Sequence, residues 1–499
     1  MENLGKFSRC ENDLKIEPLL TNKDTIAAIA TPLGSGGLGI IRISGDKAPQ
    51  IITRLFRRYH SDGLWQSHHL YVGQVVTEKG IVLDEAMAVL MYAPYSYTRE
   101  QVAELHCHGG AAHLSQVLAA CLAAGARLAE RGEFTLRAFL NGALSLDEAE
   151  AVADLISART TTAAQLAARQ LIGSLSSRIS ELEQNLLSVL AKIAVGVDFP
   201  DDVETPTAED IAGCLCVLKE EIAKLLAKAD LGRVFRDGLR LVLAGATNVG
   251  KSSLFNCLLQ TERAIVTAEA GTTRDIIEES IQLDGMPLIL TDTAGLRANQ
   301  TLLEAENKGI ERSHTALAAA QLVLVVADIT HGLDDEGKSL LTKFAATSEV
   351  GFPNHSNKTA ANRQTCLLLL NKSDLLNPQE ITASLTTIKE SYPCLTTVVV
   401  SAKTGAGIDD LLKHIKEQSF SGCFEQGKEP LLNNIRHQQA LVRADEYLAA
   451  ALQTLAEGHT PDLAAIDVEN AYQAVGEISG KTVSEEVLSS IFANFCVGK

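Results

Sequence analysis

Four short phrases in the middle of the chain hold residue types that together bind a nucleotide. They read Gly-Ala-Thr-Asn-Val-Gly-Lys-Ser-Ser at 245–253, Asp-Thr-Ala-Gly at 292–295, Asn-Lys-Ser-Asp at 371–374 and Ser-Ala-Lys at 401–403. Each phrase follows an apolar run, so each is expected at the carboxyl end of a buried strand, where open α/β sheets bind ligands. One phrase alone could arise by chance, but four in this order predict a protein that binds and hydrolyses GTP.

The first phrase is typical of a loop that binds phosphates. Gly245 and Gly250 let backbone N–H groups turn towards the phosphates, and a helix expected over 254–259 offers its N-terminus. Lys251 is placed to reach the β- and γ-phosphates, and the Ser252 hydroxyl is placed to ligate Mg²⁺.

The other three phrases predict the remaining metal and base contacts. Asp292 is expected to hold Mg²⁺ through water, with the Gly295 N–H facing the γ-phosphate. The Asp374 carboxylate can accept from the N1 and N2 donors of guanine, which adenine cannot match, so an unpaired Asp374 would penalise ATP. The segment 401–403 is expected to contact the guanine base on the side opposite Asn371 and Asp374. The predicted GTP-binding residues are Asn248, Val249, Gly250, Lys251, Ser252, Ser253, Thr267, Ala268, Glu269, Ala270, Gly271, Thr272, Thr273, Asp292, Thr293, Ala294, Gly295, Asn371, Lys372, Asp374, Ser401, Ala402 and Lys403.

Two features depart from the commonest small GTPases. Leu296 stands where a water-orienting Gln often follows the second phrase, so the catalytic group is expected elsewhere. Asn248 offers an oxygen that suits a monovalent cation beside the phosphates, or it only caps the turn, and residue type alone does not separate the two. The segment 271–275 is expected to close over the nucleotide, with Ser252 and Thr273 as Mg²⁺ ligands. The predicted K⁺ ligands are Asn248, Thr267, Glu269 and Thr272.

Four further blocks, at 24–45, 97–110, 131–142 and 495–499, extend the pattern over nearly the whole chain. Together with Asn248, Gly-Thr-Thr-Arg-Asp at 271–275 and Asp-Thr-Ala-Gly-Leu-Arg at 292–297, they closely resemble the MnmE (TrmE) family of tRNA modification GTPases. The resemblance implies a K⁺-stimulated GTPase whose G domains meet across a homodimer, and that contact orders the closing loop and completes catalysis.

The resemblance also implies a catalytic glutamate. In the family it stands three residues before a Gly-Ile-Glu-Arg segment, which here selects Glu306 ahead of 309–312. Glu304 competes for the role, because the stretch after Gly295 is a little longer than usual. A solvated carboxylate at a helix start is the plainer interpretation of either residue.

By the same resemblance, the protein acts in a heterotetramer with an FAD-dependent subunit. The complex adds an aminomethyl or carboxymethylaminomethyl group at C5 of the wobble uridine of certain tRNAs, with carbon from formyl- or methylene-tetrahydrofolate bound by the N-terminal domain. The family's folate contacts correspond to Arg42, Glu104 and Lys499, whereas Ala143 replaces a family lysine. Cys496 beside the terminal lysine is a candidate thiol near the folate, or else a buried helix-end cysteine.

The length predicts about three domains, since single cores stop growing near ~250–300 residues. We expect an α/β multidomain chain in which a P-loop GTPase domain interrupts an all-helical domain, preceded by an α+β domain similar to folate-binding domains. The predicted limits are 1–23 for an N-terminal extension, 24–141 for the folate-binding and dimerisation domain, 142–237 and 422–499 for the two parts of the helical domain, and 238–421 for the G domain. Residues 347–364 look like a surface insertion.

The formal net charge of −18 argues against a broadly basic nucleic-acid surface, so this chain alone is expected to bind tRNA weakly. Ten scattered cysteines without a Cys-x-x-Cys pair, and no signal pattern or long apolar run, predict a cytoplasmic protein that does not span a membrane.

His106 and His108, on one face of a strand, could bind a metal with His113, although structural packing is the plainer interpretation of these histidines. The other function class left open is a ribosome-assembly GTPase, which usually carries a basic RNA-binding module after the G domain.

Overall fold

The computed structural model describes residues 24–32, 34–60, 63–198, 206–261, 278–292, 316–347, 365–393, 395–419 and 431–498. The chain divides into two compact units, and each is described by itself. One unit consists of Met1–Ala153, Gln170–Leu218 and Glu446–Lys499, and the other of Asp154–Arg169 and Lys219–Asp445. The predicted domain limits stay predictions.

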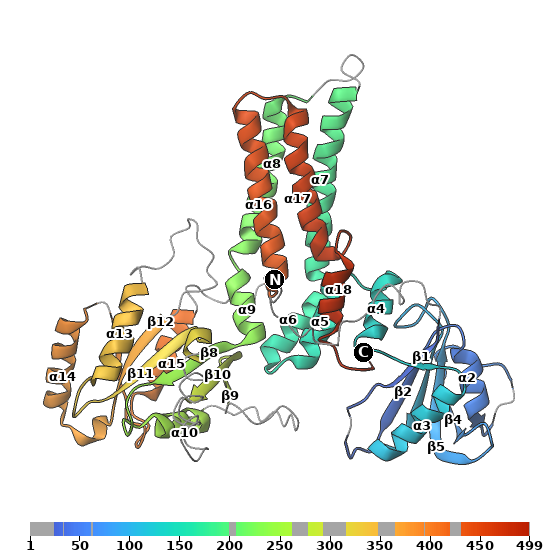
Figure 1. The fold of residues 1–499 in the computed structure, drawn as a ribbon, viewed down its shortest axis with the longest axis horizontal. Helices are drawn as coiled ribbons and strands as arrows, with labels where there is room; N and C mark the ends of the chain where they lie inside the picture. Colours follow the sequence, from blue (N-terminus) through green and yellow to red (C-terminus); the bar gives the residue numbers. More distant parts are fainter. Residues whose placement is uncertain are drawn as a thin grey trace, which may run out of the picture. The chain divides into compact units, whose positions relative to one another are not determined.

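The N-terminal part of the first unit is a seven-stranded sheet with strand order β3-β4-β5-β6-β2-β1-β7 (Figure 1). Neighbouring strands are antiparallel except β1 and β7. The strands are β1 (Ile26–Ile29), β2 (Gly39–Ser44), β3 (Phe56–Arg58), β4 (Tyr71–Val76), β5 (Val82–Met91), β6 (Val102–Cys107) and β7 (Arg127–Leu128).

Helices α2 (Ala48–Leu55) and α3 (Ala111–Ala123) pack on one face of this sheet. Because side chains alternate along a strand, Ile41 and Ile43 of β2 are buried in that core while Arg42 between them is half-buried on the other face. The alternation of side chains along β2 therefore places Arg42 on the face opposite the apolar core.

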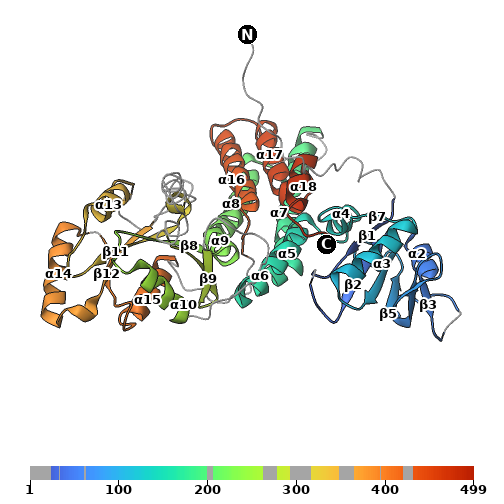
Figure 2. The same ribbon diagram turned by 60° about the horizontal axis from the view of Figure 1, so that its bottom comes forward.

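The rest of the first unit is helical. Helices α4 (Glu133–Leu140), α7 (Ser174–Asp198), α17 (Pro461–Ser479) and α18 (Glu485–Phe492) lie wholly in it. Helices α5 (Leu146–Ser157), α8 (Ala208–Leu226) and α16 (Ile435–Ala456) are divided between the two units, and α6 (Thr161–Leu171) belongs to the second unit except for its last two residues. In both ribbon views α7 and α17 run side by side (Figures 1 and 2), and they form an extensive contact. Glu183 of α7 is buried there, and it accepts from Ser479 Oγ at 2.7 Å and pairs with Lys481.

The second unit contains a six-stranded sheet with order β13-β12-β11-β8-β10-β9. Its strands are β8 (Leu239–Ala244), β9 (Glu278–Leu283), β10 (Met286–Asp292), β11 (Leu322–Asp328), β12 (Thr365–Asn371) and β13 (Thr397–Val399), and only β9 is antiparallel to its neighbour. Two of the four predicted nucleotide phrases begin with the last residue of a strand, Asp292 of β10 and Asn371 of β12. The other two follow β8 and β13, so all four lie at strand ends, as the sequence predicts.

Helices cover both faces of this parallel sheet. Helices α10 (Lys251–Thr261) and α15 (Ile408–Ser419) share an apolar core with one face, together with Phe235 of α9 (Ala229–Asp237). Helices α13 (Asp335–Thr347) and α14 (Pro378–Ser391) pack on the other face. The predicted strand–loop–helix around the phosphate loop is confirmed, because β8 leads through residues 245–250 into α10.

Within the residues described, no helix is both long and apolar enough to cross a membrane.

Candidate nucleotide site and N-terminal ligand site

The predicted nucleotide residues meet at one edge of the parallel sheet. Strands β8, β11 and β12 run parallel, and β10 and β13 join them in the same direction. Asp292 ends β10 opposite Leu243 of β8, so the phrases predicted to bind the metal and the phosphates are neighbours at that edge. The sheet thus gathers residues that are more than a hundred positions apart in the chain.

The phosphate loop has little room for side chains. Gly250 has φ of +98°, and a Cβ placed on it would stand 2.2 Å from Nδ2 of Asn371. Any other residue at position 250 would therefore push the loop away from Asn371, which belongs to the phrase predicted to bind the base. Asn248 has φ of +65°, a conformation that Asn tolerates better than most residues. The backbone conformation alone therefore explains why asparagine stands at position 248, whether or not a cation binds there. The role of Asn248 as a K⁺ ligand stays a prediction.

Lys251 is buried inside the loop that it follows. Its residue exposure is 7%, and Nζ donates to the carbonyl oxygens of Gly245 at 2.7 Å and Ala246 at 2.5 Å. The ammonium group thus lies within the loop, where an anionic phosphate would take the place of these neutral acceptors.

Asn371 joins the phosphate side of the site to the base side. Its Nδ2 donates to the Val249 carbonyl at 2.9 Å, and its Oδ1 accepts from Ala402 N at 3.0 Å. Asp374 is oriented by the last phrase, since Ser401 Oγ donates to its Oδ1 at 2.7 Å. Lys403 is exposed and lies 4.0 Å from Asp374. Hydrogen bonds therefore join the two phrases that are predicted to bind the base.

Several predicted residues lie outside the described part of the chain. They are the closing segment with Thr267, Ala268, Glu269, Ala270, Gly271, Thr272 and Thr273, the residues Thr293, Ala294 and Gly295, both candidate catalytic glutamates Glu304 and Glu306, and Lys499. The insertion is also outside it except for its first residue, which ends α13. Their predicted roles stay predictions.

The predicted folate residues Arg42 and Glu104 are paired on the face of the N-terminal sheet opposite α2 and α3. They face each other in the β2–β6 ladder, and Arg42 Nε donates to Glu104 Oε1 at 2.9 Å. The second carboxylate oxygen lies 3.1 Å from His106 Nε2. The guanidinium also lies over the rings of Tyr97 at 5.4 Å and Phe134 at 5.8 Å. Arg42 is therefore part of an ordered charged and aromatic cluster.

Burial alone would raise the pKa of the Glu104 carboxyl, but the neighbouring His106 and Arg42 outweigh burial and hold its pKa below the ordinary value. Glu104 is consequently an anion at neutral pH, and it can accept hydrogen bonds from a ligand that carries N–H donors.

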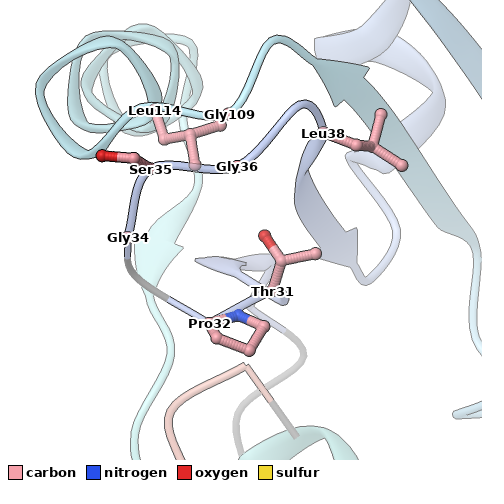
Figure 3. A pocket seen from close by; sticks show the side chains of 8 residues that line it. All are labelled: Thr31, Pro32, Gly34, Ser35, Gly36, Leu38, Gly109 and Leu114. Carbon is pink, nitrogen blue, oxygen red and sulfur yellow. The ribbon is translucent and has the colours of Figure 1, made fainter.

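A pocket of about 320 Å³ opens farther along the same strand pair. Thr31 and Pro32 form one side, and Gly36, Gly109 and Leu114 form the other (Figure 3). Leu38 at its rim precedes β2 by one residue, so the pocket and the Arg42–Glu104 pair lie about four residues apart along one chain segment, roughly 13 Å in an extended strand.

The C-terminal tail packs against the N-terminal sheet near this pocket. Gly132 N donates to the Cys496 carbonyl at 3.3 Å, and Val497 forms an isolated bridge with Arg131. A Cβ on Gly498 would stand 2.3 Å from the Ile29 carbonyl, so only glycine allows this approach. Cys496 is exposed and follows α18 by several residues, so the prediction of a buried helix-end cysteine is wrong.

The three histidines do not gather around one point. His106 binds Glu104, whereas His108 lies beyond the end of β6 and its Nδ1 is 2.8 Å from Asp84 Oδ1. His113 Nε2 is 2.9 Å from the other oxygen of Asp84. Among the residues described, no group of three or more His, Cys, Asp or Glu side chains is arranged to hold a metal ion.

Two family models match this chain. One, described as the GTP-binding protein TrmE N-terminus, matches residues 25–143, and the other, described as the MnmE helical domain, matches residues 146–496. The chain is 40% identical over 481 residues to the tRNA modification GTPase MnmE of Syntrophus aciditrophicus, with 96% of this chain and 100% of the relative covered. The chain belongs to the MnmE family of tRNA modification GTPases. The MnmE of Symbiobacterium thermophilum is 44% identical over 482 residues, with 96% and 100% covered.

Membership of the MnmE family confirms the GTPase predicted from the four phrases, and the fold class inferred with it. The ribosome-assembly alternative finds no support in these matches. The ions, the folate and the partner subunits are not decided by them.

Three residues that the sequence did not assign to these candidate sites join them in the structure, and one of them, His106, was considered only as a metal ligand. His106 and Tyr97 contact the Arg42–Glu104 pair, and Asp328 contacts Lys372. Only Asp328 had a usable signal in the sequence, because it ends an apolar run just as Asp292 does.

Proposed function

We propose that this chain is the GTP-hydrolysing subunit of a cytoplasmic complex that modifies tRNA. With an FAD-dependent partner, the complex adds an aminomethyl or carboxymethylaminomethyl group at C5 of the wobble uridine of certain tRNAs. The observation that carries the GTPase part is Asn371, which bonds the phosphate loop through Val249 and the base loop through Ala402. Phosphate and guanine contacts therefore belong to a single site.

Different residues of the site bind the phosphates, the base and the metal ion in this proposal. Backbone N–H groups of the loop and Lys251 hold the phosphates, and Asp374 selects guanine over adenine. Mg²⁺, which neutralises the charge that develops between the β- and γ-phosphates, would be held by Ser252 and Thr273, with Asp292 acting through water. The backbone position of Asp292 next to Leu243 fits that ion. Because Leu296 cannot orient water, another group must do so, and the family resemblance selects Glu306 as the proposed catalytic residue, with Glu304 as the alternative.

We further propose that K⁺ binds beside the phosphates at Asn248 with backbone carbonyls of the segment 267–272. The left-handed turn at Asn248 is compatible with this ligand set. In this proposal the G domains of two copies meet, and the contact orders the closing loop over the nucleotide.

The N-terminal cluster is the proposed site for tetrahydrofolate, which would supply the one-carbon unit. The charges of Arg42 and Glu104, the Tyr97 ring and the nearby pocket suit a ligand that has an N–H-rich ring at one end and carboxylates at the other. The tail ending in Lys499 approaches the same sheet through Gly498. Because Ala143 replaces the family lysine, either folate is held differently here or its glutamate tail is bound less tightly.

GTP hydrolysis in KCl compared with NaCl tests the GTPase proposal. The proposal predicts hydrolysis at least tenfold faster in KCl, and dimerisation of the G domains in GDP–aluminium fluoride, measured by light scattering. Lys251→Ala should abolish both effects. A slow rate that is equal in the two salts, without association, would contradict the cation-dependent mechanism.

A further inference from the structure

Asp328 ends β11 at the same sheet edge as the nucleotide phrases, yet none of those phrases includes it. β11 is buried along its whole length, and Asp328 is only 8% exposed. In the β11–β12 ladder Asp328 lies opposite Asn371, and the next residue, Ile329, donates its N–H to the Asn371 carbonyl at 3.0 Å. A buried carboxylate therefore stands directly beside the segment proposed to hold guanine.

The two oxygens of the Asp328 carboxylate have different partners. Oδ1 accepts from the Thr330 backbone N–H at 2.9 Å and from the Thr330 hydroxyl at 2.6 Å, which fixes the orientation of the side chain. Oδ2 forms an ion pair with Lys372 Nζ at 2.7 Å. His331, a largely exposed residue, lies 3.6 Å from the same oxygen.

The charge of Asp328 is secured by these contacts. Burial alone would raise the pKa of Asp328, but Lys372 and Thr330 outweigh burial and lower the pKa to about 2. The carboxylate is thus ionised over the whole range in which a GTPase is assayed, and its main cationic neighbour is Lys372.

Lys372 is held at both ends. Its backbone has φ of +67° and ψ of +34°, a left-handed conformation that is uncommon for a residue with a long side chain. The preceding Asn371 is fixed by Val249 and Ala402, and the ammonium is anchored on Asp328. The lysine stem therefore spans from the base-binding phrase to the end of β11.

We propose that Asp328 is a positioning residue for nucleotide binding, which holds the Lys372 ammonium so that the lysine stem is fixed beside the guanine site before the nucleotide arrives. A free lysine loses side-chain freedom when a ligand orders it, and an anchored one has already lost that freedom. The pair also keeps the Asp328 charge neutralised next to an anionic ligand. This inference rests on the proposed roles of Lys372 and Asp374 in binding guanine.

A double-mutant cycle tests the proposal in the full chain. GDP affinity is measured by calorimetry for the wild type, Asp328→Asn, Lys372→Met and the double variant. Asp328→Asn should weaken GDP binding about three- to tenfold in the wild-type background. In the Lys372→Met background the same change should cause no further loss, and it should restore part of the affinity because it removes an unpaired carboxylate. Equal losses in both backgrounds, or no loss in either, would overturn the proposal.

Two further variants separate positioning from a general structural effect. Asp328→Glu keeps the negative charge and should bind GDP more tightly than Asp328→Asn. Asp334→Asn is the matched control, since Asp334 lies on the same β11–α13 connection and its Oδ1 accepts only from Gly337 N at 2.9 Å among the bonds of the described residues. It should leave GDP affinity unchanged even if thermal stability falls.

One more arm distinguishes this inference from the proposed base site. Asp374→Asn must weaken GDP binding if the guanine contact is right, whatever the cycle shows. Normal GDP binding by Asp374→Asn would refute the base site, whereas an additive cycle together with a weakened Asp374→Asn would refute only the role of Asp328.

Discussion

At the scale of single residues, the proposed guanine site depends on how its polar groups are oriented before the nucleotide binds. Ser401 holds one oxygen of Asp374, and Asn371 is held at both ends of its amide. Because Ser401 occupies only one lone pair of Oδ1, the rest of the Asp374 carboxylate can accept from the paired donors of guanine. An oriented acceptor discriminates between bases better than a mobile one.

This orientation predicts a change of base specificity. Asp374→Asn places an amide donor where guanine also has donors, so GDP affinity should fall roughly a hundredfold. Xanthosine diphosphate carries a carbonyl in place of the guanine amine, so its affinity should rise relative to that of GDP. Fluorescent-nucleotide titrations of both nucleotides give the two affinities. Asp410→Asn, an exposed change on α15, is the control, and unchanged GDP preference in Asp374→Asn would contradict the assignment.

The residues that sequence reasoning found and those it missed differ in one physical respect. Asn371, Asp374 and Ser401 belong to phrases whose residues are neighbours in the chain, so their chemistry can be read locally. The partner of Asp328 is 44 positions away, and the two meet only because β11 and β12 are adjacent strands. Strand order is a property of the whole sheet, and a single sequence does not reveal which charged side chains it brings together.

At the scale of elements, α4 is tied to the N-terminal sheet by buried charges. Glu133 in its first turn is fully buried and binds Arg127 at 2.7 Å and Arg137 at 2.8 Å. Asp24, just before β1, also binds both arginines at 2.6 Å. The sequence blocks around residues 24 and 131–142 were recognised only as a resemblance, and the network gives these blocks a structural role.

The network predicts a dependence of stability on pH. Burial alone would raise the pKa of Asp24, but its hydrogen bonds to Arg127 and Arg137 outweigh burial and lower the pKa. A carboxyl whose folded-state pKa is lowered stabilises the fold above its unfolded pKa of about 3.9, and that stabilisation is lost as the pH falls through the lower folded-state value. Asp24→Asn should therefore cost about 1–3 kcal/mol at pH 7, and the cost should shrink below about pH 4.

Denaturant unfolding at pH 7 and pH 3 measures this difference. Glu78→Gln, at an exposed turn, makes the same change from carboxylate to amide and should leave stability within about 0.5 kcal/mol of the wild type. A cost for Asp24→Asn that is the same at both pH values would mean that the ion pairs do not contribute as described.

At the scale of the whole molecule, the chain combines two kinds of site in separate compact units. The unit with the N-terminal sheet carries the proposed folate cluster around Arg42 and Glu104, and the unit with the parallel sheet carries the proposed nucleotide site. Hydrolysis of GTP does not itself build a bond to uridine, so it can serve modification only by changing conformation or assembly. The net charge of −18 fits the proposal that a partner subunit supplies much of the basic surface for tRNA.

If GTP hydrolysis by this chain serves tRNA modification, the modified nucleosides of tRNA should depend on that hydrolysis. A bacterial strain without its own MnmE family member would be complemented with the wild-type chain or with Lys251→Ala, and wobble nucleosides would be measured by mass spectrometry. We predict the aminomethyl or carboxymethylaminomethyl uridine with the wild type and only unmodified or differently modified uridine with Lys251→Ala. Equal modification with both chains would contradict the account.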